Sequence, residues 1–275
     1  WTFALNEVRS AISSKKLREL AVAQSLSSPR LVEHMRYHDK VVGRQDGILE
    51  TVVDESTNLQ INSIESHDDP IICDWVEFIT NRYIKPSSLD EVLILLPCSA
   101  RKPYSRSKSH KNFKNAIAHN AAHEVMITSP LGLVPRDLEA VWPAGRYDIP
   151  VTGDWNLQEV ERVKSMINAL ISRNKYRVII NHSSIEIDTE IPVINTRLGD
   201  RATSDQALGR LKSAVIDNVR MKKRNGTLVN LDTYRSISRL QFLNDDWLEN
   251  CDISGRFPRW KIMRDGEQIA MWAPE

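Results

Sequence analysis

Residues 91–110 read EVLILLPCSARKPYSRSKSH, an apolar run that passes directly into a basic, polar stretch. The run from Glu91 to Pro97 is short and continuously apolar after its glutamate, which is typical of a strand buried on both faces of a parallel sheet. From Arg101 to Lys114 the chain has six lysines and arginines, one histidine and no acid. We therefore expect a central strand here, with the chemistry of the protein in the loop that follows it.

Similar apolar segments recur farther along the chain. They predict strands over 123–129 and 176–181, with 191–195 as a candidate fourth, and helices over 109–121 and 156–173. Strands that alternate with helices indicate a parallel sheet with helices on its faces. The sequence therefore predicts an α/β fold, a three-layer sandwich around a short parallel sheet.

Glycine and proline punctuate the segment 129–155, which is too long for an ordinary connection and is typical of a binding loop. It contains two aspartates with different interpretations. The Asp148 carboxylate would orient an amine or act as a general base, or it would be an ordinary turn residue. For Asp154 we favour a role as the N-cap of the following helix.

The residues before the core have a helical pattern and then an irregular one. Apolar residues recur at helical spacing near the start of the chain: Leu5, Val8 and Ile12. Ser28–Pro29 is typical of a helix start, whereas 43–69 is polar and weakly patterned, and 70–83 again indicates a helix. We predict a helical segment with a linker over 1–69.

The last part of the chain combines helical and strand-like signals. Thr203 and Gln206 fit a capping box, and strand-like pieces lie around 234–243. Asp265–Gly266 separates two further strand-like runs, as in a hairpin. We predict a small α+β domain over 202–275, preceded by the α/β core over 70–201.

The composition is that of a globular protein, with 41% hydrophobic residues and a net charge of +1. No apolar run approaches the roughly 20 residues of a membrane span. Three widely spaced cysteines argue against a zinc finger and against a secreted disulfide framework. We therefore expect a cytoplasmic protein that needs no membrane, no metal and no cofactor of its own.

Polar side chains stand at the ends of three predicted strands. In open α/β sheets, ligands bind beyond the carboxyl ends of the strands, where Cys98, Ser129 and His182 lie. We expect these ends to form one pocket. It would also hold other side chains from the stretch after the central strand: Lys102, Tyr104, Ser107 and His110.

Cys98 has two interpretations. A thiol close to Arg101, Lys102 and His110 would have its thiolate favoured and would act as a nucleophile. Alternatively, Cys98 is a buried cysteine that packs at the strand end.

The cations after the strand indicate a polyanionic partner, because six positive charges without an acid suit phosphates better than a solvated surface. They are Arg101, Lys102, Arg106, Lys108, Lys111 and Lys114. Among them, Tyr104 would stack on a base or pack against the sheet edge.

The stretch 97–110 fits the pattern Pro-Cys-x3-Lys-Pro-Tyr-x2-Ser-x2-His, which resembles the signature of archaeosine synthase, a tRNA-modifying relative of tRNA-guanine transglycosylase. TSPLGLVPRDLE (128–139) and YDIPVTGDW (147–155) also resemble blocks of that family. Residues 1–40 resemble the end of its transglycosylase-like region, and 205–274 resembles the small domain that precedes a PUA domain. Since the rest of the transglycosylase-like domain, its zinc site and the PUA domain are not in this sequence, we expect a fragment or a split or reduced member.

The resemblance implies a transferase that acts on tRNA carrying 7-cyano-7-deazaguanine (preQ0) in the D-loop and converts the nitrile toward the amidine of archaeosine. The implied amine donor is lysine, with a radical-SAM enzyme as partner, or glutamine in an amidinotransferase. The resemblance also implies a core similar in fold to uracil-DNA glycosylase, in which a flipped base enters a pocket at the strand ends. A homo-oligomer is compatible with these features.

Position at the strand ends, charge and the resemblance together give two sets of candidate residues. The catalytic set is Cys98, Lys102, Tyr104, Ser107, His110 and Asp148. The set that binds the base or the tRNA is Pro97, Arg101, Pro103, Arg106, Lys108, Lys111, Ser129, Arg136 and His182.

Two chemical routes and two other functions are open at this point. Either the Cys98 thiolate adds to the nitrile and the amine displaces it from a thioimidate, or the amine attacks directly. In the direct route His110 or Asp148 would take the proton of the amine, and Lys102 or Tyr104 would donate one. The other functions are a non-catalytic subunit that presents tRNA to a partner enzyme and a glycosylase-like hydrolase.

Overall fold

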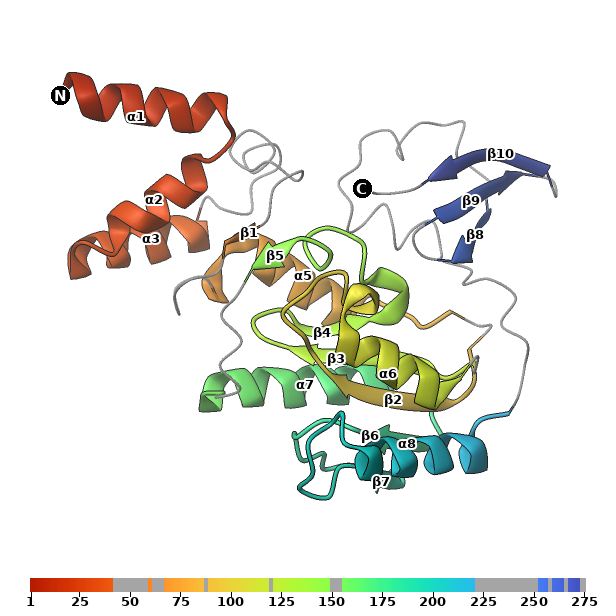
Figure 1. The fold of residues 1–275 in the computed structure, drawn as a ribbon. Coiled ribbons are helices and arrows are strands. Elements are labelled where there is room, and N and C mark those ends of the chain that lie inside the picture. The colour runs from red at the N-terminus through yellow and green to blue at the C-terminus, as the bar shows by residue number, and fades with distance from the viewer. Residues whose placement is uncertain are drawn as a thin grey trace. The chain divides into compact units, whose positions relative to one another are not determined.

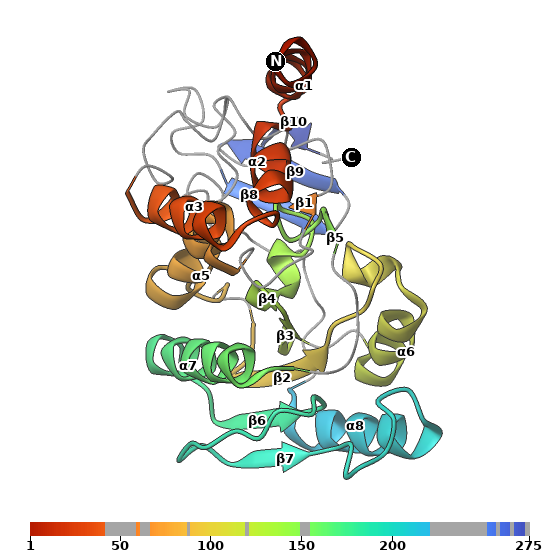
Figure 2. The ribbon, with the colours of Figure 1, turned by 90° about the vertical axis from the view of Figure 1, so that its left-hand side faces the viewer.

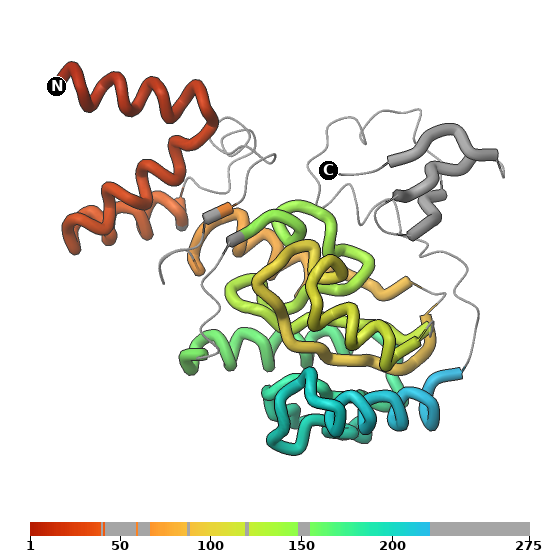
Figure 3. Tube along the Cα trace, viewed as in Figure 1, coloured from red at the N-terminus to blue at the C-terminus, as the bar shows by residue number. Residues whose placement is uncertain are grey.

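The structure is a computed structural model. It describes residues 1–41, 59–60, 67–86, 89–118, 121–148, 155–220, 252–256, 259–264 and 267–272. The chain, traced in Figure 3, falls into two compact units, residues 1–74 with 146–150 and residues 75–145 with 151–275. The three domain boundaries expected from the sequence stay predictions.

The first unit is mainly helical, as the sequence predicts. Its helices are α1 (Thr2–Ser13), α2 (Leu17–Ser25) and α3 (Pro29–Val41). Two short strands, β1 (Leu59–Gln60) and β5 (Tyr147–Asp148), pair in parallel. The apolar residues whose spacing predicts α1 are exposed in the structure: Leu5, Val8 and Ile12.

A buried ion cluster connects the helices of the first unit. The Arg18 side chain donates from Nη2 to Asp39 Oδ2 at 2.8 Å and from Nε to Asp69 Oδ2 at 3.1 Å. All three side chains are less than one-tenth exposed. Since Arg18 lies on α2 and Asp39 on α3, while Asp69 directly precedes Pro70, the cluster fixes these segments against one another.

The second unit is built on a five-stranded sheet with the order β4-β3-β2-β6-β7 (Figure 1). The central strand β2 (Val92–Pro97) runs parallel to β3 (His123–Thr128) and β6 (Val178–Asn181). β7 (Val193–Asn195) is parallel to β6, and β4 (Gly132–Pro135) is antiparallel to β3. The predicted α/β class and the parallel strands are therefore confirmed, and the sheet gains an antiparallel edge strand that the sequence analysis left inside a loop.

Helices lie on both faces of this sheet. Figure 2 shows α7 (Leu157–Arg173) on one face and α6 (Lys108–Ile117) with α8 (Asp205–Asn218) on the other. The helix predicted over 70–83 is α5 (Pro70–Asn81), with Ile72 and Ile79 fully buried. Every residue from Val92 to Leu96 is also fully buried, as expected for a strand covered on both sides.

Two predicted helix starts need correction. α7 begins at Asn156, whose side chain accepts from the Glu159 N–H in a complete capping box, so Asp154 is not its N-cap. α8 begins after Ser204, whose side chain accepts from the Ala207 N–H, so the capping residue is not Thr203. In both cases the actual cap has an extended backbone that places its side-chain oxygen over the first free N–H groups of the helix.

The end of the chain forms a three-stranded antiparallel sheet of β8 (Asp252–Arg256), β9 (Arg259–Arg264) and β10 (Glu267–Trp272). Arg264 pairs with Glu267, which confirms the hairpin predicted around Asp265–Gly266. The strand-like pieces expected around 234–243 lie outside the described residues.

The burial of the central strand makes a prediction about stability. Replacing Ile94 by alanine should lower the free energy of unfolding by about 2–5 kcal/mol, because the side chain is fully buried and a cavity would remain. Urea unfolding measures the change. The control Ile216→Ala, at a position on α8 that is 66% exposed, should change the free energy by less than about 0.5 kcal/mol. Equal effects of the two variants would contradict the described core.

Candidate active site

The carboxyl ends of β2, β3 and β6 lie side by side at one edge of the sheet. The Cys98 N–H donates to the Ile127 carbonyl at 3.1 Å, and the His182 N–H donates to the Leu95 carbonyl at 2.9 Å. The backbone just after β2 thus donates to β3, and β2 itself accepts from the residue that follows β6. Open α/β sheets bind ligands at such an edge.

The loop after β2 leads into α6 through a short 3-10 helix, Tyr104–Arg106. Ser107 is the N-cap of α6, and its buried hydroxyl accepts from the His110 N–H at 3.2 Å. Ser107 therefore orients the first turn of the helix that carries His110. Ser107 was predicted to be catalytic, and the structure shows that its hydroxyl caps α6.

Four aromatic rings form a buried row beside the strand ends. The ring centroids of Tyr104 and His110 are 5.3 Å apart, those of His110 and Phe113 are 5.1 Å apart, and those of Phe113 and His182 are 5.2 Å apart. All four side chains are at most 1% exposed. The row fixes the loop, α6 and the end of β6 relative to one another through ring packing.

Both ring nitrogens of His182 are bonded within the protein. Nε2 donates to the Ala202 carbonyl at 2.7 Å, and Nδ1 lies 2.7 Å from Thr196 Oγ1. Burial lowers the pKa of His182, with smaller effects of the Arg197 and Arg210 charges in the same direction; the Ala202 carbonyl raises it. The structure thus places this predicted binding residue at the strand ends, with its nitrogens engaged by the fold.

Arg136 lies in a buried ion network rather than on the surface. It donates from Nε to Glu124 Oε2 at 2.9 Å and from Nη1 to Glu139 Oε2 at 2.8 Å. Its Nη2 lies 3.0 Å from His110 Nδ1. Glu139 Oε2 also accepts from the Ser105 N–H at 3.0 Å, which connects the network to the signature loop.

The environment of His110 keeps its imidazole neutral. Burial and, to a smaller extent, the nearby Arg136 charge lower the pKa of His110 to about 2, against a smaller raising effect of the Pro97 carbonyl. Its Nε2 is buried and makes no hydrogen bond within the described part of the chain. His110 is therefore an uncharged side chain at neutral pH.

Of the two interpretations of Cys98, its surroundings fit the buried thiol better than the favoured thiolate, and its part in the reaction stays a prediction. Burial raises the pKa of the Cys98 thiol, and this outweighs the Thr128 hydroxyl and the Lys102 charge, which lower it. The half-buried thiol is therefore protonated at rest. The sequence left both interpretations open, because the number of neighbouring cations does not show how deeply the thiol is buried.

The cations of the stretch lie mostly on the surface. Arg101, Arg106, Lys108, Lys111 and Lys114 are exposed, whereas Lys102 and Pro103 are half-buried. Lysines 108, 111 and 114 belong to α6. These exposed cations belong to the same loop and helix that carry three rings of the aromatic row, and we call them the charged surface.

Two predicted residues have other surroundings. Ser129, directly after β3, is half-buried and its hydroxyl donates to Glu159 in the first turn of α7. Asp148 belongs to the first unit, where the backbone of β5 pairs with β1, so its role at the strand ends stays a prediction.

Sequence reasoning missed the buried acids of this site, Glu124 and Glu139. Glu124 is a charged residue but is only 4% exposed, because it lies on β3, where all residues are buried. A glutamate inside the apolar run 123–129 was the available signal, because a buried carboxylate needs a cationic partner. The partner itself is one of 37 lysines and arginines, and only the fold selects Arg136.

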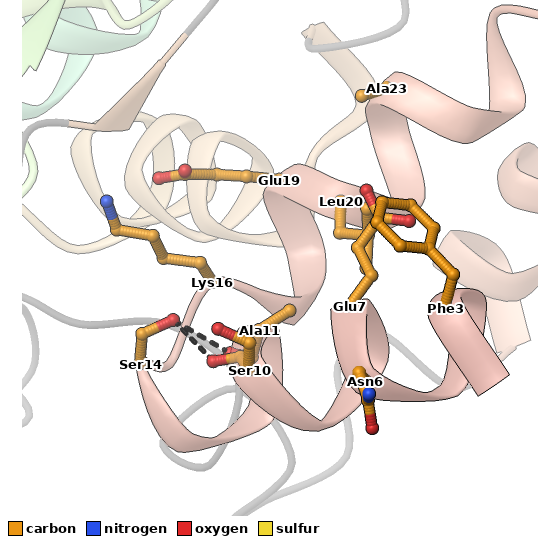
Figure 4. Close-up of a pocket in the computed structure, with 10 residues that line it drawn as sticks. All are labelled: Phe3, Asn6, Glu7, Ser10, Ala11, Ser14, Lys16, Glu19, Leu20 and Ala23. Atoms are coloured by element: carbon orange, nitrogen blue, oxygen red, sulfur yellow. Dashed lines mark hydrogen bonds between the residues drawn. The ribbon is translucent and has the colours of Figure 1, made fainter.

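Further observations concern metal ligands, membrane spans and a groove in the first unit. Within the described residues, no group of three or more His, Cys, Asp or Glu side chains is arranged to bind a metal, and no helix is long and apolar enough to span a membrane. The first unit has a groove of about 530 Å³ between α1 and α2, lined by residues such as Phe3, Lys16 and Leu20 (Figure 4). Neither cysteine nor histidine lines this groove.

Comparison with known proteins follows the same residues. A family model described as a domain of unknown function (DUF5591) matches residues 72–215, more than half of the chain. The chain belongs to this family. The matched range contains the whole sheet of the second unit, the signature loop and most of α8.

The resemblance to archaeosine synthase is confirmed. The archaeosine synthase subunit alpha of Thermoplasma acidophilum is 33% identical over 96% of this chain and 51% of its own length. The corresponding subunit of Methanosarcina acetivorans is 28% identical over 98% of this chain and 46% of its own length. The archaeosine synthase of Haloferax volcanii is 28% identical over 98% and 48%, respectively. The chain thus spans about half the length of these relatives.

One solved structure is also similar. The crystal structure of AF0587, a protein of unknown function, is 26% identical, with a TM-score of 0.48 over 72% of this chain and 67% of that one.

The lowered pKa of His110 predicts a loss of stability in acid. The folded protein keeps His110 neutral, whereas the unfolded chain binds a proton below its ordinary pKa of 6.5. The stabilising contribution is therefore present above pH 6.5 and is lost as the pH falls through that value. Between pH 7.5 and 5.5 the wild-type free energy of unfolding should fall by about 1.4 kcal/mol more than that of His110→Gln, measured by urea unfolding. Identical pH dependence of the two proteins would contradict this environment.

Proposed function

We propose that this chain carries the part of a tRNA-modifying transferase in archaeosine biosynthesis that adds an amine, lysine, to the nitrile of preQ0 in the D-loop. The observation that carries the proposal is the position of the signature. Cys98 follows the central strand at the ligand-binding edge of the sheet, and Tyr104 and His110 pack together in the loop and helix that follow. The relatives are named archaeosine synthase, which supports a role in archaeosine biosynthesis.

The proposed addition is balanced without a redox partner. The nitrogen of the amine forms a bond to the nitrile carbon, and one proton moves from that nitrogen to the nitrile nitrogen. The product is an amidine that retains all atoms of both reactants. The protein has to bring the amine to the nitrile and stabilise the negative charge that develops on the nitrile nitrogen.

We propose that the reacting base leaves the tRNA stack and enters the edge formed by the strand ends, as a flipped base does in the uracil-DNA glycosylases whose fold the family resemblance implies for the core. In this proposal the buried aromatic row, to which Tyr104 belongs, would border the planar base. The exposed cations of the loop and α6 would hold the surrounding phosphates. This division suits a substrate that is a neutral base on a charged backbone.

We further propose that a partner completes the modification. Two relatives are named subunit alpha, which indicates an assembly with at least one more subunit. A radical-SAM enzyme would convert the lysine adduct to archaeosine. We assign the reaction to the cytoplasm, and we propose no cofactor for the addition itself.

The addition can be tested by mixing the protein with preQ0-containing tRNA and lysine and weighing the nucleosides. The mass of the modified nucleoside should rise by one lysine, because addition loses no atom. Unchanged preQ0 in the presence of the partner proteins would support a subunit that only presents tRNA. Release of free base would support a hydrolase.

The role of Cys98 can be separated from the rest of the site. Cys98→Ala should reduce lysine addition to background if a thioimidate forms, and it should leave most of the activity if the amine attacks directly. Ser99→Ala is the matched control, since Ser99 is half-buried beside Cys98 and its hydroxyl bonds only to the Arg101 carbonyl in the described structure. A large loss in this control would mean that the loop itself is disturbed.

The charged surface makes a prediction about salt. Lys111→Ala should weaken tRNA binding and lower the slope of log K against log salt concentration by about 1, because one phosphate contact is lost. Filter binding at several salt concentrations measures the slope. Lys164→Ala, an exposed lysine on α7 at the opposite face of the sheet, should leave the slope unchanged.

A further inference from the structure

The bonding of His110 determines which of its ring nitrogens carries the proton. Arg136 Nη2 lies 3.0 Å from Nδ1. A guanidinium is always protonated and can only donate, so Nδ1 must accept, and the proton of the neutral ring must be on Nε2. The geometry of this one contact therefore fixes the tautomer.

Arg136 is itself held so that it cannot turn away. Two carboxylates, Glu124 and Glu139, accept from its Nε and Nη1, and their side chains are 5% and 2% exposed. The rings of Tyr104 and Phe113 pack against the imidazole, with their centroids 5.3 and 5.1 Å from its centroid, respectively. The direction of the Nε2–H bond is thus determined before any substrate arrives.

This Nε2–H group makes no hydrogen bond in the part of the chain that the structure describes, although it is buried. The Pro97 carbonyl raises the pKa of the ring, as an acceptor near a ring N–H does, but no contact between the two meets the geometry of a hydrogen bond. Two more buried polar atoms also lack a partner among the described residues. They are Ser105 Oγ, in the loop before α6, and Trp142 Nε1, three residues after Glu139. Buried donors without partners are rare in folded proteins, and such groups are expected to bond a ligand or water.

We propose that Arg136 is a positioning residue that holds His110 as the neutral Nε2–H tautomer, and that this N–H donates a hydrogen bond to the nitrile nitrogen of the bound base. The proposal rests on the proposed function for the identity of the acceptor. It assigns His110 to the stabilisation of the charge that develops on the nitrile nitrogen and removes it as a base for the amine, because its only lone pair is already engaged by Arg136. It also gives Arg136 a role inside the site in place of a contact to tRNA phosphate.

The tautomer can be read without any activity. In protein labelled with ¹⁵N-histidine, long-range ¹H–¹⁵N spectra distinguish a protonated from an unprotonated ring nitrogen, and His110→Gln identifies the signal. His110 should show Nε2–H and a bare Nδ1 from pH 5 to 8. His182 is an internal reference, because its Nε2 donates to the Ala202 carbonyl. A protonated Nδ1 on His110, or titration within this range, would overturn the proposal.

Arg136→Lys tests the positioning. Lysine keeps the charge opposite the two carboxylates but lacks the planar fork that reaches three partners. The Nδ1–H tautomer should become detectable in this variant. An unchanged, pure Nε2–H spectrum in a folded Arg136→Lys protein would show that Arg136 does not set the tautomer.

The donor role needs substrate and a pair of variants. His110→Gln keeps an N–H donor near the Nε2 position and should retain at least about one-tenth of kcat for lysine addition. His110→Leu, which has no donor, should lose about 10²–10³-fold in kcat with KM for tRNA within about threefold of wild type. Equal loss in both folded variants would indicate that His110 acts as a base and would overturn the proposal.

If the chain adds no lysine at all, the proposed function fails while the donor can still be measured. Adding preQ0-containing tRNA to the labelled protein should then shift the Nε2–H signal of His110, whereas the same tRNA without the nitrile should not. Binding of the tRNA without a nitrile-dependent shift would reject the donor role.

Discussion

The network around the Arg136 side chain joins four segments of the second unit. Through Glu124 it is bonded to β3, through Glu139 to the residues after the second 3-10 helix (Arg136–Leu138), and through the Glu139 carboxylate to the Ser105 N–H of the signature loop. Its last contact, to His110, reaches α6. A buried ion pair adds little net stability compared with well-packed apolar residues of similar volume, whereas removal of one partner costs about 3–5 kcal/mol. What such a network does contribute is a defined arrangement, and here the arrangement is that of the loop around the strand ends.

The electrostatic consequence is a separation between a neutral interior and a charged surface. Inside, the burial of the ring and the positive charge of Arg136 oppose a second proton, and so a positive charge, on the His110 ring. Burial also keeps Cys98 in its thiol form. Outside, the cations of the loop and α6 remain exposed. The proposed substrate, a heterocyclic base on a phosphate backbone, needs these two environments, and both occur within the stretch of the chain from 97 to 114.

The sequence predicted the framework because the framework depends on local pattern. The continuous apolar run of β2 and the signature after it identified the central strand and the loop, and the structure confirms the strand. Strand β4 could not be predicted in the same way, because four residues, GLVP, after a turn carry too weak a pattern until β3 provides a partner. The pairing of Arg136 with Glu124 and the degree of burial of Cys98 depend on contacts between segments at the sheet edge. Periodicity along the chain does not reveal such contacts. The capping residues differed from expectation by one or two positions, because several adjacent polar residues can cap and only the backbone geometry selects one.

A comparison of three buried histidines in the second unit shows why His110 stands out. His123, at the amino end of β3, lies between two phenols, with Tyr83 at 2.9 Å from Nε2 and Tyr176 at 2.7 Å from Nδ1. His182 has both nitrogens bonded to Thr196 and Ala202. These two rings are complete within the fold, so their burial is explained by structure alone. His110 is equally buried and is held by an arginine on one side, yet its other nitrogen has no bond in the described structure. The fold thus satisfies two buried histidines within itself and leaves one donor of the third without a bond among the described residues, at the sheet edge where we propose that the base binds.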